Sequence, residues 1–227
     1  MPECWINSIF KKEELKSFKN IEGIAIVPNI IKVIQENADH LSELDGSIGD
    51  GDHGINMSKG FSLCEKAMEG QNHDFAKSLS ILGRILLTEI GGSMGPLYGS
   101  FFNSMAKVIK DEELITAQIF IKMIDSSIIK IQEIGNAKLG DKTLLDTLIP
   151  AKNAYSLALY KGMDFSEAID EMIIAAVKGR DSTKDMIAKI GRAARLGERS
   201  RGFLDAGATS CCLILESMGT SIKKLLI

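Results

Sequence analysis

Three aspartates, Asp45, Asp50 and Asp52, are crowded into eight residues and separated by glycines. Carboxylates a few ångströms apart repel one another and raise one another's pKa unless a cation lies among them. All-oxygen donors on a flexible loop suit a hard ion, and Mg²⁺ commonly binds one or two carboxylates and completes its shell with water and phosphate oxygens. The segment therefore predicts a magnesium site that faces a phosphorylated ligand. A polar turn with helix-capping aspartates is the alternative interpretation, because Asp and Gly are common turn residues.

The same loop matches two other motifs, and both matches fail on their context. The spacing Gly49-x-Gly51-x-x-Gly54 fits the dinucleotide-binding fingerprint, but no strand is expected before it, and its aspartates would repel a pyrophosphate. An EF-hand loop counted from Asp50 would place Phe61 where an acidic calcium ligand is required. Neither motif is an adequate explanation of the acidic loop.

Three later segments could also contribute to a binding site. Residues 91–99 are rich in glycine, residues 135–143 nearly match a Walker A loop but lack a preceding strand, and residues 191–208 contain four arginines. A glycine backbone can approach a ligand closely, and the N-terminus of a following helix attracts anions. Arginine can neutralise a phosphate or stack on a base. Each segment alone is equally compatible with an ordinary helix connection or an exposed surface.

These segments lie between stretches with helical periodicity. Alternation with period two is hard to find, and apolar residues recur at three-to-four spacing, for example in residues 168–177. We therefore expect an almost wholly helical chain, and residues 1–20 could add a short amphipathic helix. The expected helices cover residues 28–44, 54–69, 74–90, 96–110, 112–134, 143–161, 165–179, 183–196 and 206–225.

Bulk properties exclude several classes of protein. The 227 residues fit one domain, residues 1–227, in which 1–20 form an extension of unknown role. A net charge of −3 supplies no general attraction to nucleic acid. The four cysteines lack the spacing of a zinc or redox site, and the N-terminal residues lack the pattern of a secretory signal, so we expect a reducing, cytoplasmic setting. Charges interrupt the longest apolar stretch, residues 114–134, which argues against a membrane span.

Taken together and in this order, four segments resemble the ADP-binding L subunits of dihydroxyacetone kinases. The resemblance spans residues from about Ile30 to the C-terminus. It implies an all-α antiparallel barrel of about eight helices with the nucleotide at one end. The four segments are DGSIGDGDHGINM at 45–57, GGSMGPLYG at 91–99, GDKTLLD at 140–146 and LGERSRGFLDAGA at 196–208.

The resemblance also implies roles for individual residues. It implies that two Mg²⁺ ions bridge ADP or ATP to Asp45, Asp50 and Asp52, which act as catalytic metal ligands. His53 continues this loop onto the phosphates and is counted with the catalytic residues, although a histidine that only begins a helix is the alternative. The other implied nucleotide contacts are Asn56, Ser93, Met94, Gly135, Leu144, Arg192, Asp205 and Gly207.

In that family a separate K subunit holds the keto-sugar, and the L subunit supplies the phosphoryl group. We therefore expect a kinase subunit that acts on a small ketose held by a K subunit and is recharged by an M subunit of the phosphotransferase system. One alternative is a subunit that exchanges ATP. Another is the nucleotide domain of fatty-acid kinases, in which threonine would be expected at the position of His53. A third is a non-catalytic, nucleotide-loaded protein that binds a transcription regulator.

Overall fold

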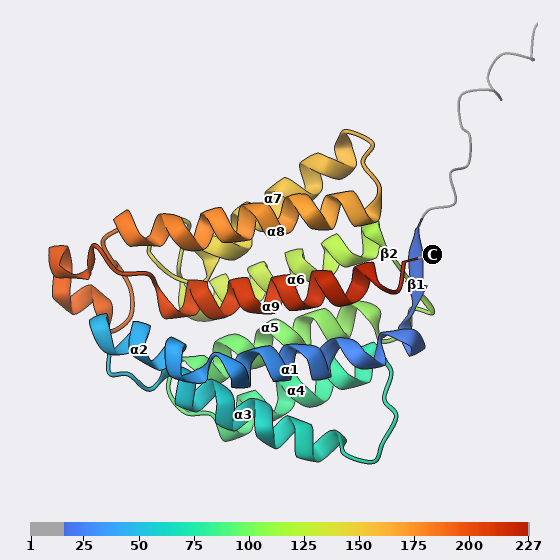
Figure 1. Cartoon of the computed structure of the whole chain (residues 1–227), viewed down its shortest axis with the longest axis horizontal. Helices are drawn as coiled ribbons and strands as arrows, with labels where there is room; N and C mark the ends of the chain where they lie inside the picture. The colour runs from blue at the N-terminus through green and yellow to red at the C-terminus, as the bar shows by residue number, and fades with distance from the viewer. Residues whose placement is uncertain (1–15, 227) are drawn as a thin grey trace, which may run out of the picture.

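The computed structural model describes residues 16–226, and its long helices form a closed ring (Figure 1). Around the ring, each helix packs against the next in the order α1, α3, α4, α5, α6, α7, α8, α9 and back to α1, and neighbours run antiparallel. The predicted all-α antiparallel barrel of about eight helices is confirmed. The ring consists of α1 (Ile26–Glu36), α3 (His53–Met68), α4 (Phe75–Glu89), α5 (Met94–Ile109), α6 (Ala117–Gly135), α7 (Leu145–Tyr160), α8 (Phe165–Ser182) and α9 (Ala206–Lys223).

Apolar stripes on these helices fill the interior of the ring. In α1 the five buried residues Ile26, Val27, Ile30, Ile31 and Ile34 recur at helical spacing and form one face. Full burial of one such side chain contributes about 1.5–3 kcal/mol. Aromatic pairs in T-shaped contact add to the core, with centroids 4.9 Å apart for Phe101 and Phe102 and 5.4 Å apart for Phe120 and Tyr155.

One helix, α2 (Ala38–Ile48), lies outside the ring against α3 and α9. The prediction of a continuous helix over residues 28–44 is wrong, because the chain bends at Asn37 between α1 and α2. The Asn37 side chain donates a hydrogen bond to the carbonyl of Val33 at 2.8 Å, a local bond that competes with a regular helix. The bend directs α2 toward one end of the ring, where it ends just after Asp45.

A small sheet closes the opposite end. Strand β1 (Ser17–Lys19) pairs antiparallel with β2 (Leu114–Thr116), and buried Phe18 faces buried Ile115. The 3₁₀ helix η1 (Asn20–Ala25) connects β1 to α1. The prediction of a helix from residue 112 is therefore corrected, because 114–116 form a strand. Of the predicted N-terminal helix, residues 1–15 lie outside the described residues, and residues 17–19 form a strand instead.

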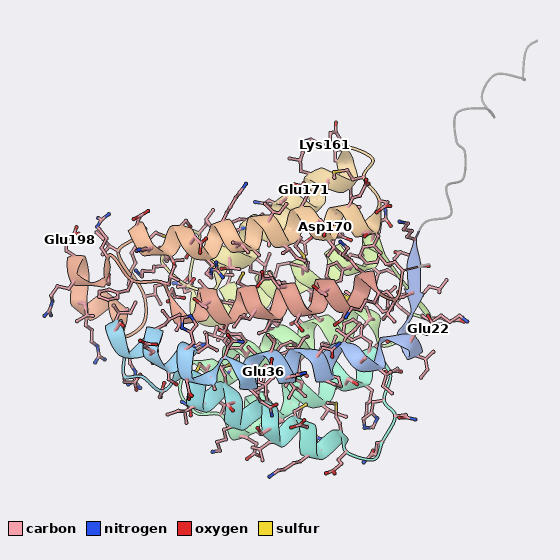
Figure 2. All side chains as sticks on the ribbon, viewed as in Figure 1. Glu22, Glu36, Lys161, Asp170, Glu171 and Glu198 are labelled. Carbon is pink, nitrogen blue, oxygen red and sulfur yellow. The ribbon has the colours of Figure 1, made fainter. Side chains whose placement is uncertain are left out.

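The predicted helix over residues 183–196 is wrong. The segment contains only two 3₁₀ helices, η2 (Thr183–Asp185) and η3 (Ala193–Ser200), with an irregular stretch between them. Gly191 and Gly197 have φ values of 74° and 55°, a left-handed backbone that interrupts a right-handed helix. Figure 2 shows Glu198 of η3 at the end of the molecule that lies opposite Glu22 of η1. The segment from 183 to 205 therefore caps the end of the ring that α2 also reaches.

Alternation of helix direction places every second connection at the same end of the ring. The connections α2–α3, α4–α5, α6–α7 and α8–α9 lie at the end with α2 and η3, and the connections α3–α4, α5–α6 and α7–α8 lie at the end with the small sheet (Figure 1). The four connections at the end with α2 and η3, together with the helix ends beside them, contain all four motif segments of the sequence. The fold therefore brings together residues that are as much as 162 positions apart, from Asp45 to Gly207.

In the part of the chain that the structure describes, every helix is too short or too polar to cross a lipid bilayer.

Candidate metal and nucleotide site

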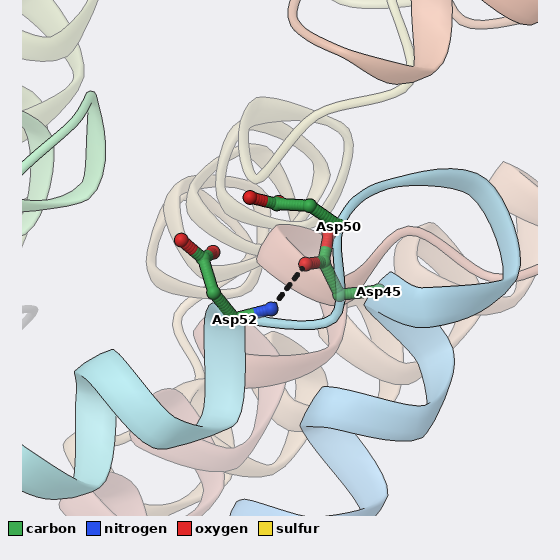
Figure 3. A group of neighbouring side chains, drawn as sticks. All are labelled: Asp45, Asp50 and Asp52. Carbon is green, nitrogen blue, oxygen red and sulfur yellow. Dashed lines mark hydrogen bonds between the residues drawn. The ribbon is translucent and has the colours of Figure 1, made fainter.

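The three aspartates form a compact cluster at the α2–α3 connection (Figure 3). One carboxylate oxygen from each of Asp45, Asp50 and Asp52 lies within 4.8 Å of the others. The backbone N–H of Asp52 donates a hydrogen bond to Asp45 Oδ2 at 3.0 Å, which fixes the last aspartate beside the first. Gly51, between them, has a φ of 77°, a conformation that glycine adopts without strain. The loop thus turns back on itself and directs three carboxylates to one place.

The charges of this cluster are poorly compensated by the protein. Burial and then the negative charges of Asp50 and Asp45 raise the pKa of Asp52. The guanidinium of Arg192, which forms a salt bridge with Asp50, opposes this shift. An all-carboxylate donor set with residual repulsion fits a hard divalent cation such as Mg²⁺. Asp45, Asp50 and Asp52 are the residues that would hold it.

The cluster opens onto a pocket of about 310 Å³ to which all four connections contribute. Eleven of the twelve residues predicted from the sequence line this pocket, which brings the four motif segments into one site. They are Asp45, Asp50, Asp52, His53, Ser93, Met94, Gly135, Leu144, Arg192, Asp205 and Gly207. Asn56 does not line the pocket. It lies one turn along α3, where a hydrogen bond from its side chain opposes the rise in the pKa of Asp52.

Helices α3 and α5 begin at the pocket without side-chain caps. The residues that precede α3 and α5, Asp52 and Ser93, make no side-chain capping bond within the described structure. Side-chain oxygens of Asp74, Thr116, Asp164 and Asp205 cap α4, α6, α8 and α9, whereas α1 and α7 also begin without a side-chain cap. Uncapped first turns offer N–H groups and the positive end of the helix dipole to an anion. The pocket therefore combines a cation site with anion-binding helix termini.

An apolar wall completes the pocket. Met94, Leu97, Leu144 and Ile190 line it together with the backbone of Gly135. A flat aromatic ring can bind between such side chains, while a charged tail extends toward the acids and the helix termini. The pocket lining thus combines apolar side chains with charged groups.

A series of buried hydrogen-bonding side chains holds the ring of His53 in place. Its Nε2 lies 2.8 Å from Ser210 Oγ, and Ser210 Oγ lies 2.6 Å from the hydroxyl of Tyr98. The Tyr98 hydroxyl also lies 3.1 Å from the carbonyl of Gly207, to which it can donate. Burial lowers the pKa of His53 to about 4, so the imidazole is neutral at neutral pH. A neutral imidazole in a fixed orientation can donate or accept one hydrogen bond with a ligand, and it adds no positive charge to the pocket.

Asp205 has a structural and an electrostatic role in the pocket. Its carboxylate caps α9 by accepting a hydrogen bond from the backbone N–H of Ala208 at 2.7 Å. Burial raises the pKa of Asp205 to about 7, although this capping bond and the charge of Lys142 act in the opposite direction. The pocket therefore contains a fourth carboxyl group, and its protonation state changes near neutral pH.

Sequence reasoning missed several lining residues, of which Tyr98, Lys142 and Ile190 matter most. Tyr98 and Lys142 lie within the motif segments 91–99 and 140–146. Their position in these segments could have been used to predict that they line the pocket. Ile190 precedes the arginine-rich segment, and no local pattern distinguishes it from an ordinary core isoleucine.

Comparison with solved structures identifies the class of this fold. The crystal structure of the dihydroxyacetone kinase of C. freundii in its native form matches 97% of this chain and 38% of its own, with a TM-score of 0.68 at 21% sequence identity. A structure of the kinase from C. freundii in complex with AMP-PNP and Mg²⁺ matches with a TM-score of 0.66 at the same identity. The helical ring is thus the fold found in a part of these kinases.

Sequence comparison defines the family. The DAK2 domain model matches residues 47–220, and the chain belongs to this family. It is 39% identical over 186 residues to the ADP-binding subunit DhaL of PEP-dependent dihydroxyacetone kinase 1 of Listeria innocua, covering 82% of this chain and 88% of that protein. It is 32% identical over 193 residues to the corresponding Escherichia coli subunit, covering 85% and 92%. The predicted resemblance to the L subunits is therefore confirmed.

Proposed function

We propose that this chain is the ADP-binding subunit of a PEP-dependent dihydroxyacetone-type kinase and transfers a phosphoryl group to a small ketose held by a separate subunit. The observation that carries this proposal is the placement of Asp45, Asp50 and Asp52 beside two uncapped helix N-termini in one pocket. Relatives named as ADP-binding subunits of such kinases match more than four fifths of the chain, which supports the same activity.

In this proposal the protein positions the reactants and performs no covalent chemistry itself. The three aspartates would hold two Mg²⁺ ions, which would supply positive charge beside the nucleotide phosphates. The first turns of α3 and α5 bind phosphate oxygens through backbone N–H groups, and His53 contributes one hydrogen bond from its fixed ring. Met94, Leu97 and Leu144 would contact the base.

The open end of the pocket is where the partners would bind. We propose that a K subunit presents the ketose hydroxyl there and that an M subunit of the phosphotransferase system recharges the resident ADP. Relatives from Listeria innocua and Lactococcus lactis are named as PEP-dependent and PTS-dependent kinase subunits, which supports recharging over the exchange of free ATP. The proposed setting is the cytoplasm, where these soluble phosphate donors are present, and residues 1–227 are proposed to act as one domain.

The content of the purified protein tests this proposal. Protein should be denatured after gel filtration, and the supernatant assayed for ADP and Mg²⁺ before and after long dialysis. We expect about one ADP per chain with bound Mg²⁺, both retained through dialysis. Recovery of ADP only before dialysis would favour exchange of ATP in place of a resident carrier. A protein that contains no nucleotide and binds none when ADP and Mg²⁺ are added would contradict the proposed function.

A further inference from the structure

Lys142 is a buried cation in the turn between α6 and α7. Only 2% of its surface is exposed, and its backbone φ is 63°, a left-handed conformation that non-glycine residues rarely adopt. Its Nζ donates hydrogen bonds to the carbonyl oxygens of Ser200 at 2.6 Å, Phe203 at 2.7 Å and Met186 at 3.3 Å. An ammonium group has three donors, so all of them are committed to backbone carbonyls.

The turn that carries Lys142 is itself anchored to the ring. Buried Asp146, in the first turn of α7, accepts hydrogen bonds from the backbone N–H groups of Gly140 and Thr143. The Thr143 bond is 2.7 Å long. The backbone on both sides of Lys142 is therefore attached to a helix of the barrel, and the ammonium projects from a fixed support.

The segment that Lys142 contacts has little apolar anchoring of its own. Within residues 186–204, all of which the structure describes, only Ala188 and Ser200 are buried. Other bonds to the turn exist, such as the one from the Lys189 backbone N–H to the Asp141 carbonyl at 3.1 Å. Ile190, which is partly buried, packs against the core and supplies some apolar anchoring. Polar contacts contribute much of the remaining anchoring, because few other side chains of the segment are buried.

This segment supplies one wall of the pocket. Ile190, Gly191, Arg192 and Ala193 all line it, and Arg192 forms the salt bridge with Asp50. The lysine contacts the segment at three points, one before and two after these lining residues. Its bonds thus fix both ends of the wall relative to α7.

We propose that Lys142 is a positioning residue that holds the segment 186–204 over the pocket and so controls the lifetime of bound nucleotide. The near match of residues 135–143 to a Walker A loop would instead predict a lysine that reaches the phosphates. The structure does not place Lys142 in that role, because its donors are already used. The effect on nucleotide lifetime rests on the proposed function, whereas the anchoring of the segment does not.

A lysine-to-methionine pair of variants tests the anchoring. Lys142→Met keeps most of the apolar stem and removes the ammonium, and Lys138→Met is the matched control, because Lys138 is exposed in the same turn. Hydrogen–deuterium exchange of the nucleotide-free proteins should be faster across residues 186–204 in Lys142→Met only, with the ring helices unchanged. With ADP and Mg²⁺, Lys142→Met should release ADP about 10- to 100-fold faster, the range for loss of hydrogen bonds to a charged group. Unchanged exchange across 186–204 in folded Lys142→Met would overturn the proposal.

A measurement on the unaltered protein covers the case in which Lys142→Met does not fold. In ¹⁵N-lysine-labelled protein, a buried ammonium with three acceptors should give a resolved Nζ signal that exchanges slowly with water, and Lys138→Met should retain it. Absence of any slowly exchanging lysine ammonium signal would overturn the proposal. If the protein binds no ADP at all, the proposed function fails, but the exchange and ammonium measurements still decide whether Lys142 anchors the segment.

Discussion

The backbone N–H of Asp52 donates a hydrogen bond to the side chain of Asp45, seven residues earlier, at 3.0 Å. This bond closes the acidic loop and sets the spacing of its carboxylates before any cation is bound. Asp45 therefore has two tasks, because the same carboxylate both shapes the loop and belongs to the cluster. Asp50 and Asp52 have side chains without this loop-closing role, which makes them the better positions for testing the chemistry of the site.

Asp50→Asn and Asp52→Asn should leave the fold intact and abolish Mg²⁺-dependent retention of ADP. Each change removes one negative charge from a cluster that repels itself, and Asp50→Asn also removes the exposed ion pair with Arg192, so the free energy of unfolding without metal should change little. Gel filtration with ADP and Mg²⁺, followed by nucleotide assay, measures the retention. Asp39→Asn, an exposed acid in the first turn of α2, is the matched control and should behave like wild type. Wild-type ADP content in both site variants would reject the assignment.

Arg192→Gln should have opposite effects on metal and on nucleotide. Arg192 competes with a cation for Asp50, so its removal should let nucleotide-free protein bind Mn²⁺ about two- to fivefold more tightly, as expected for loss of an exposed ion pair. Retention of ADP with Mg²⁺ should fall, because a positive group beside the phosphates is lost. Electron paramagnetic resonance of free Mn²⁺ gives the first quantity. Arg195→Gln, exposed in the same segment, is the control. Weaker Mn²⁺ binding by Arg192→Gln would contradict this account.

Asp205 should make the nucleotide-free protein less stable as pH rises through neutrality. Burial raises its pKa from 3.8 to about 7, so the folded state binds this proton more tightly than the unfolded state does. The free energy of unfolding therefore falls between about pH 4 and about pH 7. Asp205→Asn can still cap α9 and should lack this decrease.

Denaturant unfolding of wild type and Asp205→Asn at about pH 5 and about pH 8 measures the difference. The advantage of the variant should grow by at least about 1.4 kcal/mol over this range, the equivalent of one pKa unit. Other acids contribute equally to both proteins, so the comparison isolates Asp205. Parallel pH profiles for the two proteins would show that the Asp205 carboxyl is not buried as described.

Gly54→Ala should destabilise the protein and weaken metal binding. A Cβ at this position would overlap the carbonyl oxygen of Ala38, which forces the first turn of α3, just after the acidic loop, away from the first turn of α2. Overpacking of this kind costs about 1–3 kcal/mol. Gly91→Ala is the control at the same end of the ring, because a Cβ there would meet nothing within 4 Å. Thermal unfolding without metal measures the effect, and equal stability of the two variants would contradict the close helix crossing.

Local patterns predicted the helices and the acidic cation site, whereas the closed ring and most of the individual pocket residues were predicted from the resemblance to the L subunits. Apolar periodicity predicts a helix such as α1, and crowded carboxylates predict a cation site. The alternation of directions in a ring of short connections then places every second connection, and with it all four motif segments, at one end. Eleven of the twelve predicted site residues line one pocket for this reason.

The wrong predictions have physical causes that cannot be seen in the local sequence pattern. The bend at Asn37 depends on a side-chain bond to Val33 and on the packing of α2 outside the ring. The segment 183–196 contains helix-forming residues, yet Gly191 adopts a left-handed backbone and Lys142 holds the segment from 44 residues away, at Met186. A bond of such long range cannot be inferred from spacing, which is why the sequence assigned no role to Lys142.

The dependence of ADP binding on divalent cations tests the central claim most directly. Protein stripped of nucleotide and treated with a chelator should be titrated calorimetrically with ADP, once without metal and once with excess Mg²⁺. We predict measurable heat of binding only in the presence of Mg²⁺, and no such difference for Asp50→Asn or Asp52→Asn. Equal affinity of the wild-type protein for ADP with and without Mg²⁺ would show that the three aspartates do not bind the nucleotide through a metal.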